Sequence, residues 1–448
     1  MWNKSFLQQL IKLGFPIMLQ NLFTVLGATI TTLMTGQLGD VPLAAIGLAN
    51  QLFFILSLVQ FGISSGAAIF TAQFWGNNDK DGISKVLGVS LLVDLSVSAM
   101  FMAIALFFPG DFLHLFTSDK QVIELGVSVL KIVGFSYLFT PITFTYNAIL
   151  RSTGNVRLPM VVSSIGILLN IVFGYLLIFG KLGMPALGAQ GAAYANLIAR
   201  VVECAVMVGM TYYLKTPLAV HPRQMFSFNT SFLSKILKRV LPVTINELMW
   251  ALGISAYSAI YAHISTEAIA AINIRASIED MFFAPFLGIT HACAIVVGNA
   301  IGSGEQEKSH GYIKQTVRIV LVMGICLGAV LIFGRGFIAS LYNISDLTNF
   351  YTRNLLLVLG AFLWLRTINT LYFVAMLRSG GDTHFGSLVD VGCMWLIGVP
   401  AALVTAFVFH LPVYFVYLSI MLDEATKLVL FINRYRSRKW IHNLVERA

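Results

Sequence analysis

The sequence has little charge and few cysteines, and it lacks the motifs of nucleotide- and metal-dependent enzymes. Only 11% of its 448 residues are charged, less than half of the roughly 25% usual in soluble domains. The four cysteines, Cys204, Cys293, Cys326 and Cys393, have no redox or metal-ligand spacing. No P-loop, Rossmann glycine pattern, HExxH or nucleophile elbow is present. These deficits exclude a disordered chain, a disulfide-built secreted module and an ordinary soluble enzyme.

Apolar residues, by contrast, make up 57% of the chain, and the mean hydropathy is +0.82. A membrane helix needs about 20 such residues, and a helix satisfies its own backbone hydrogen bonds in lipid. We therefore predict an all-α membrane protein with twelve transmembrane helices, at residues 14–38, 44–75, 86–109, 127–150, 158–180, 188–214, 241–264, 268–301, 312–334, 353–377, 385–409 and 413–434.

The lysines and arginines between these spans indicate the topology. With the N-terminus in the cytoplasm, inside segments hold 19 basic residues, outside segments 4, and the spans or their edges 6. Cytoplasmic loops carry the excess of positive charge in membrane proteins. We therefore expect a multi-pass protein of the cell membrane with both termini in the cytoplasm, and we interpret its net charge of +9 as topology rather than nucleic-acid binding.

The two halves of the chain repeat one another. At an offset of 226 residues, Pro16 meets Pro242 and Gly62-Ile63 meets Gly288-Ile289, and at 227 Leu150-Arg151-Ser152 meets Leu377-Arg378-Ser379. Each half has six predicted spans, and parallel repeats of this kind are typical of transporters. We predict two pseudo-symmetric six-helix lobes at 1–214 and 241–434, a cytoplasmic linker at 215–240 and a basic tail at 435–448.

The motifs resemble those of multidrug and toxic compound extrusion (MATE) transporters over nearly the whole chain. The resemblance lies in Gly36-Gln37-Leu38-Gly39, in Gly62-Ile63-Ser64-Ser65-Gly66 leading to Ala72-Gln73-Phe74-Trp75-Gly76, and in the paired Leu-Arg-Ser motifs. It implies two helical bundles and export of hydrophobic, often cationic, compounds driven by protons or sodium. Thr31 stands where many relatives have an aspartate, so the resemblance does not carry over that coupling residue.

Charged residues inside a membrane are costly and are functional candidates by default. The spacing pairs Arg200 with Glu203, Arg275 with Glu279, and Lys427 with Asp423 and Glu424, each three or four residues apart on one helix. For ion coupling we predict Glu247, Glu279 and Asp390 in the second lobe, with Asp94 open between a structural and a coupling role. Glu247 ranks first because it has no basic neighbour one turn away. Arg151 and Arg378 are interpreted as anchors at the membrane surface.

The first-half spans also carry amide, aromatic and methionine side chains suited to a flat cation. This predicted substrate cavity contains Gln51, Phe53, Asn147, Tyr137, Tyr146, Asn170 and Met34, although hydrogen bonds between helices also explain such amides.

The expected function is therefore secondary multidrug efflux by cation antiport, with alternating access and without enzymatic activity. We expect a monomer that needs the lipid bilayer, toxic organic cations as substrates, and no metal or cofactor beyond the coupling ion. Two alternatives remain open, a lipid-linked sugar flippase of the same superfamily and a membrane-embedded enzyme. A flippase would favour a basic cavity, whereas the second-half spans hold six acids against three bases.

Overall fold

The computed structural model describes residues 4–342 and 344–445, and every regular element among them is helical. The helices divide into two compact units, each of which is described by itself. The N-terminal unit is residues 19–244, and the C-terminal unit combines residues up to 18 with those from 245 onward. The last three residues of the predicted tail at 435–448 lie outside the described residues.

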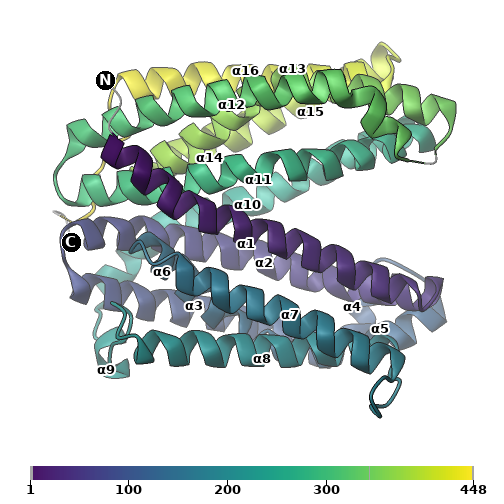
Figure 1. Cartoon of the computed structure of the whole chain (residues 1–448), viewed down its shortest axis with the longest axis horizontal. Helices are drawn as coiled ribbons and strands as arrows, with labels where there is room; N and C mark the ends of the chain where they lie inside the picture. The colour runs from purple at the N-terminus through teal and green to yellow at the C-terminus, as the bar shows by residue number, and fades with distance from the viewer. Residues whose placement is uncertain (1–3, 343, 446–448) are drawn as a thin grey trace. The chain divides into compact units, whose positions relative to one another are not determined.

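The N-terminal unit is a helical bundle in which α7 and α8 lie side by side, as do α2 and α3 (Figure 1). Asp79 and Asp119 begin helices by accepting hydrogen bonds from the free backbone N–H groups of the first turn. Gly39, with φ of +97°, allows the tight turn between the first two helices. Its helices are the end of α1 (Lys4–Gly36), α2 (Asp40–Gly76), α3 (Lys80–Phe107), α4 (Pro109–His114), α5 (Lys120–Ser136), α6 (Thr140–Ser152), α7 (Arg157–Phe179), α8 (Ala189–Tyr213), α9 (Pro222–Met225) and the start of α10 (Thr230–Ile264).

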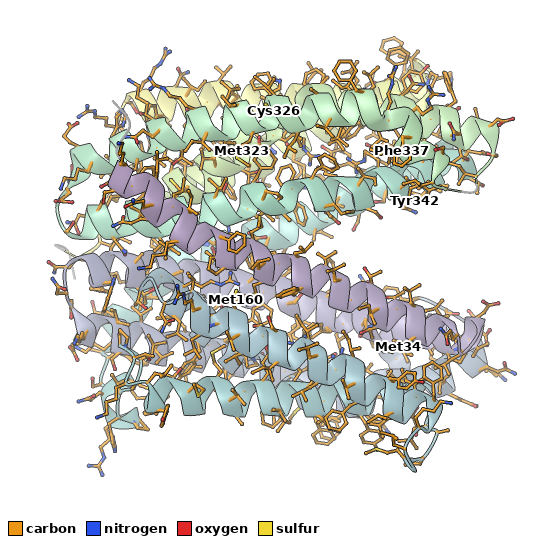
Figure 2. All side chains as sticks on the ribbon, in the orientation of Figure 1. Met34, Met160, Met323, Cys326, Phe337 and Tyr342 are labelled. Atoms are coloured by element: carbon orange, nitrogen blue, oxygen red, sulfur yellow. The ribbon has the colours of Figure 1, made fainter. Side chains whose placement is uncertain are left out.

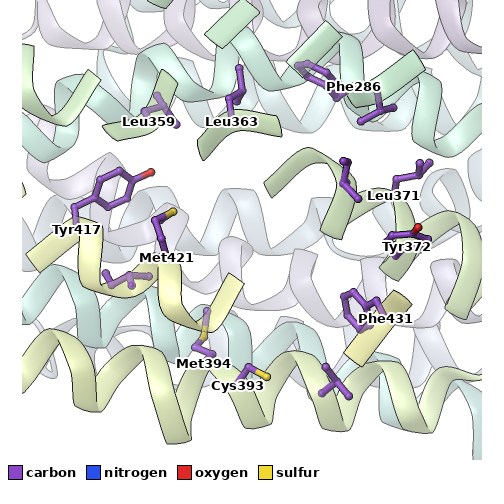
Figure 3. Close-up of a cluster of buried hydrophobic side chains, with 14 of the residues drawn as sticks. Phe286, Leu359, Leu363, Leu371, Tyr372, Cys393, Met394, Tyr417, Met421 and Phe431 are labelled. Atoms are coloured by element: carbon purple, nitrogen blue, oxygen red, sulfur yellow. The ribbon is translucent and has the colours of Figure 1, made fainter. Parts of the chain in front are cut away.

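The C-terminal unit has its core between α11, α13 and α16, where large side chains such as Phe286, Leu359 and Tyr417 pack together (Figure 3). Two of its membrane segments, Asp346–Arg378 and Thr383–Val408, contain π-helical stretches, labelled η. Its elements are the start of α1, the end of α10, α11 (Thr266–Gly302), α12 (Gln306–Ser340), α13 (Asp346–Leu371), η1 (Tyr372–Arg378), α14 (Thr383–Cys393), η2 (Met394–Gly398), α15 (Val399–Leu403), η3 (Val404–Val408) and α16 (Val413–Arg436).

Outward-facing side chains are apolar, as a lipid environment requires. On α12, Val322 is 60% exposed and Phe337 71% exposed, and Figure 2 labels Phe337 and Cys326 on this helix. Within residues 4–342 and 344–445, ten helices are long and apolar enough to cross a membrane, and the bent pair α5–α6 makes an eleventh if it counts as one span. Helix α16 covers the twelfth predicted span, although its charged residues make it less apolar.

One predicted span is not a single straight helix. The stretch 127–150 is broken between α5 and α6, with a bend of 45°. Pro141 lies in the first turn of α6, where its missing N–H costs no hydrogen bond, so the second helix begins there. The corresponding part of the second half stays continuous but becomes π-helical at η1.

The π-helical stretch η1 explains why the repeat offset changes. The N-caps Asp119 and Ser345 are 226 residues apart, whereas Arg151 and Arg378 are 227 apart. The second half therefore gains one residue in this interval. A π-helical turn bonds each residue to the fifth one along rather than the fourth, so it absorbs one extra residue without breaking the helix.

The unit boundaries lie inside α1 and α10, not at the ends of the predicted linker. Residues 4–18 belong to the C-terminal unit and residues 230–244 to the N-terminal unit. A Cβ atom on Gly288 would lie 2.7 Å from the carbonyl oxygen of Gly14. In the other unit, a Cβ atom on Gly62 would lie 2.5 Å from the Cα of Thr244. Gly62 and Gly288 are repeat equivalents. In each unit, the helical segment that comes from the other half of the chain therefore packs against the same glycine.

Candidate functional site

The C-terminal unit contains a buried cluster of one lysine and two aspartates, here called the Lys427 triad. The Nζ atom of Lys427 lies 3.0 Å from Asp390 and 3.5 Å from Asp423. Asn246 on α10 donates a hydrogen bond of 3.2 Å to Asp390. The triad therefore joins α10, α14 and α16 and has one positive charge for two carboxyl groups.

Two of the three members of the triad are deeply buried, and Asp390 is half-buried. Asp423 is 2% exposed and Lys427 5% exposed. Among the described residues, the Oδ1 atom of Asp423 and the hydroxyl of Tyr257 have no hydrogen-bond partner. A Cβ atom on Gly398 would lie 2.2 Å from the Tyr257 hydroxyl and 3.0 Å from Asp423 Oδ2. The lack of a side chain at position 398 therefore leaves room for the Tyr257 hydroxyl and the Asp423 carboxyl group.

A second cluster forms around Glu279 on α11. Arg275, one helical turn earlier, lies 2.7 Å away, and Arg366 from α13 contacts the other carboxylate oxygen. Arg366 also lies 3.9 Å from Glu424 and donates a hydrogen bond to the Tyr417 hydroxyl. With two guanidinium groups and two carboxylates, this cluster is balanced in charge, which is the usual condition for burying ions.

Glu247 is also paired, contrary to the reasoning that ranked it first. Arg378, at the end of η1, places Nη2 2.5 Å from Glu247, and its guanidinium lies 4.3 Å from the centre of the Phe373 ring. Arg378 is 5% exposed, so it is not a surface anchor. Glu247 has no basic neighbour one turn away on its own helix, but its partner Arg378 is 131 residues further along the chain.

The N-terminal unit carries related contacts at the equivalent positions. Gln20 donates to Ser163 at 3.0 Å, and these residues are the repeat equivalents of Asn246 and Asp390. Arg200, the equivalent of Lys427, lies 2.7 Å from Glu203 on its own helix. The same place in the fold therefore holds a neutral hydrogen bond and a balanced ion pair in one unit, and a triad with one base for two acids in the other.

Asp94 on α3 stands apart from these pairs. It is fully buried, and Thr145 on α6 lies 3.3 Å from one of its carboxyl oxygens. No ion pair within residues 4–342 and 344–445 includes it.

The predicted cavity residues fall into separate groups within the N-terminal unit. Phe53 stacks on Tyr137 with 5.9 Å between ring centres. Asn147 donates to Ser163 at 3.4 Å, and Asn170 donates to Thr31 at 3.4 Å. Met34 packs near Gly174 on α7. Tyr137 and Tyr146 are buried, whereas Gln51, Phe53 and Asn170 are half-buried.

Sequence reasoning missed the partners that come from other helices. It did not join Arg378 to Glu247, Arg366 to Glu279, or Lys427 to Asp390. One signal was available for the triad, because the repeat offset of 227 aligns Lys427 with Arg200, a basic residue inside the equivalent span of the first half.

Comparison with known proteins gives one consistent result. The MatE family model matches twice, at residues 16–176 and 242–404. "Probable multidrug resistance protein YoeA" of Bacillus subtilis is 24% identical over 96% of this chain and 94% of its own. "Probable multidrug resistance protein NorM" of Thermotoga maritima is 23% identical over 97% and 93%.

Solved structures share the fold. A MATE crystal structure in the bent conformation has a TM-score of 0.88 at 20% identity and covers 97% of this chain and 95% of its own. An MOP superfamily transporter from Pyrococcus furiosus has a TM-score of 0.85 at 20% identity, over 96% and 95%.

Apolar helices long enough to cross a membrane, an internal repeat, and buried charge clusters in the C-terminal unit are together typical of membrane transporters. The two matches of the family model cover more than half of the chain, and the protein belongs to the MatE family.

Proposed function

We propose that this protein exports hydrophobic, cationic small molecules in exchange for a proton or a sodium ion, through conformations that open to each side of the membrane in turn. The names of its relatives support a multidrug substrate range. We further propose that it works as a monomer in the cell membrane with both termini in the cytoplasm, and that it needs no cofactor beyond the coupling ion.

The observation that carries the proposal is the charge of the Lys427 triad. A single ammonium group faces two carboxyl groups, one of which is only 2% exposed. Burying a charge without a partner is very unfavourable, so the excess carboxylate needs a cation whenever the site is closed. A proton on Asp423 or Asp390 meets this need, as does a sodium ion, since hard cations prefer oxygen ligands.

Glu247 and Glu279 have supporting roles in this proposal. Each already has a guanidinium partner, so neither needs a further cation in this conformation. They become coupling residues only if those pairs open during transport. Asp390 is therefore the principal acid of the three predicted ones, and Asp423 is its partner.

Antiport follows when the drug and the coupling ion respond to the same charge. If a cationic drug is bound most favourably with the triad ionised, binding of the coupling ion weakens drug binding by the same factor that the drug weakens ion binding. For drug contact we propose the half-buried side chains Gln51, Phe53 and Asn170, with Tyr137 supporting Phe53 from behind. A net negative triad disfavours the anionic headgroup that a flippase would carry.

The test uses the full-length protein in inside-out vesicles with ethidium as the substrate. A pH gradient alone and a sodium gradient alone are compared, first for the wild type and then for Asp390→Asn, Asp423→Asn and Glu305→Gln. Glu305 belongs to an exposed pair with Lys308 and is the control. We expect one gradient to drive ethidium movement, the two aspartate variants to lose this drive, and the control to keep it.

Exchange of ethidium without a gradient should persist in the aspartate variants, because only the coupling is removed. If neither gradient moves ethidium through the wild type, the antiport proposal is wrong. If Asp390→Asn and Asp423→Asn both retain gradient-driven transport, coupling does not depend on the triad.

A further inference from the structure

A column of polar side chains runs through the core of the N-terminal unit. It is separate from the Gln20–Ser163 contact that corresponds to the Lys427 triad. Gln60 on α2 donates hydrogen bonds of 3.0 Å to both Ser98 on α3 and Thr140 on α6. Nearer the other end, Thr71 and Ser152 lie 2.6 Å apart. These five side chains are buried, so the contacts tie α2, α3 and α6 together in the interior.

Asp94 belongs to this column, one helical turn away from the side chains that Gln60 contacts; this position is here called the Asp94 level. It lies one helical turn from Ser98 on α3, and its neighbour Thr145 lies just over one turn from Thr140 on α6. Because α2 and α3 are consecutive and antiparallel, one turn along α2 from Gln60 brings Ser64 to the same level. Three helices thus each direct an oxygen-bearing residue to this level.

The level is short of hydrogen-bond partners. Among the described residues, Oδ1 of Asp94 has none, and neither have the hydroxyls of Ser64 and Ser90, which are 3% and 2% exposed. Ser90 is one turn before Asp94 on the same helix. Such orphaned buried groups are rare in folded proteins and call for a specific explanation.

Packing of the fold does not explain the acid. The residue 226 positions later, at the equivalent place on α12, is Val320, which is fully buried. The equivalent of Ser98 is Gly324. The equivalents of Ser64 and Ser90 are Thr290 and Thr316, so the C-terminal unit keeps hydroxyl groups at this level but has no acid, and the same architecture forms without a carboxyl group there.

Charge around Asp94 gives the remaining constraint. Most titratable side chains on the helices packed against α3 are exposed, namely Lys120, Glu124 and Lys131 on α5, Asp111 and His114 on α4, and Arg223 on α9. Asp40 lies at the far end of α2. On α6, Arg151 donates to Gln20 and Tyr146 is an uncharged phenol. On α3 itself, Lys85 is paired with Asp81 near the start of the helix. Within the part of the chain that the structure describes, an ionised carboxylate at 94 would thus have no paired counter-charge, which is prohibitive in an apolar interior.

We infer that Asp94 is a proton-binding site of the N-terminal unit, separate from the Lys427 triad. The proton is taken from water onto the free oxygen Oδ1, while Thr145 bonds to Oδ2, and it returns to water when the bundle opens. A proton fits better than sodium because α2 and α3 are unbroken here, so their carbonyl groups are engaged in helical hydrogen bonds. Sodium sites in such proteins draw on unwound backbone carbonyls.

The test reads protonation directly and needs neither a drug nor a gradient, so its result is independent of the proposed antiport. Infrared spectra of the purified full-length protein are recorded at neutral pH for the wild type, Asp94→Asn and Glu203→Gln. The spectrum of each variant is then subtracted from that of the wild type. Glu203 is the matched control, since it is a buried acid of the same unit that is paired with Arg200. We expect a carbonyl band of a protonated carboxylic acid to disappear in Asp94→Asn and to persist in Glu203→Gln.

Replacing sodium chloride by choline chloride should leave that band unchanged. A band that vanishes on adding sodium would overturn the proton assignment, and a protonated-acid band whose intensity is unchanged in Asp94→Asn would overturn the site. A residual band that Asp390→Asn or Asp423→Asn removes belongs to the Lys427 triad and not to Asp94. If Asp94→Asn does not fold, Asp94→Val replaces it, because valine is the residue that the other repeat uses at this position. Loss of the protonated-acid band in Asp94→Val would equally support a proton-binding site at Asp94.

Discussion

The pair of Glu247 and Arg378 allows the sharpest test of the buried charge clusters. The Glu247 side chain is 12% exposed, the Arg378 side chain 6%, and their nearest atoms are 2.5 Å apart. Removing one partner of a buried pair leaves an uncompensated charge and costs about 3–5 kcal/mol. We therefore expect Glu247→Gln and Arg378→Met each to lower the melting temperature by roughly 6–20 °C, if the unit responds like a soluble domain of its size.

The double variant E247Q/R378M should recover most of this loss, because no unpaired charge remains. Replacing an entire buried pair is often close to neutral. The measurement is thermal unfolding of the purified protein in one detergent, for the wild type, both single variants and the double variant. Glu305→Gln, from an exposed pair, is the control and should change nothing measurable.

Additive losses in the double variant would refute the pair, since two coupled side chains must show an interaction energy. The same four proteins also separate structure from coupling. If the pair is only structural, the double variant exports ethidium under a gradient at the wild-type rate. If Glu247 carries the coupling ion, the double variant is stable but loses gradient-driven export.

Three further predictions follow from other parts of the molecule. Gly88→Ala should destabilise the protein markedly, because its Cβ would lie 1.9 Å from the backbone oxygen of Met225, whereas Gly47→Ala, with nothing within 4 Å, should leave the melting temperature equal or higher. Hydrogen bonds from His442 and Arg434 outweigh burial and hold the pKa of Asp382 below its ordinary value, so its contribution to stability is present above about pH 4. That contribution is lost as the pH falls through the lower folded pKa, and acid unfolding of Asp382→Asn should lack it; an unchanged acid profile would contradict the contact. In a cysteine-free background, cysteines at 120 and 182 should react with an impermeant reagent from outside the cell and cysteines at 223 and 307 should not, and outside labelling at 223 would contradict the predicted topology.

Much of the fold was predictable because apolar runs and helices have nearly the same limits here. The predicted span 158–180 corresponds to Arg157–Phe179, and 188–214 corresponds to Ala189–Tyr213. The bend between α5 and α6 was not predictable from hydropathy, since the two helices together are apolar enough to be read as one span. The borrowed segments of α1 and α10 were also missed, because a continuous helix gives no local sign of a change in its neighbours.

The candidate site was predictable only in its local parts. Arg200–Glu203 and Arg275–Glu279 lie three and four residues apart, so helix periodicity predicts their contact. Asp390–Lys427 and Arg378–Glu247 depend on which helices become neighbours, and spacing along one helix contains no such information. Glu247 looked isolated for that reason.

The exchange of helical segments between the two units also has a consequence for synthesis. Phe6 stacks on Tyr312 with 4.3 Å between ring centres, and Gly14 approaches Gly288. These turns of α1 therefore wait for neighbours that are translated about 300 residues later. The N-terminal unit, in turn, lacks the turns that face Gly62 until residue 244 has been made. The N-terminal bundle therefore cannot close until the start of the second half has been translated, whereas the C-terminal bundle closes on a segment that was made long before the rest of it.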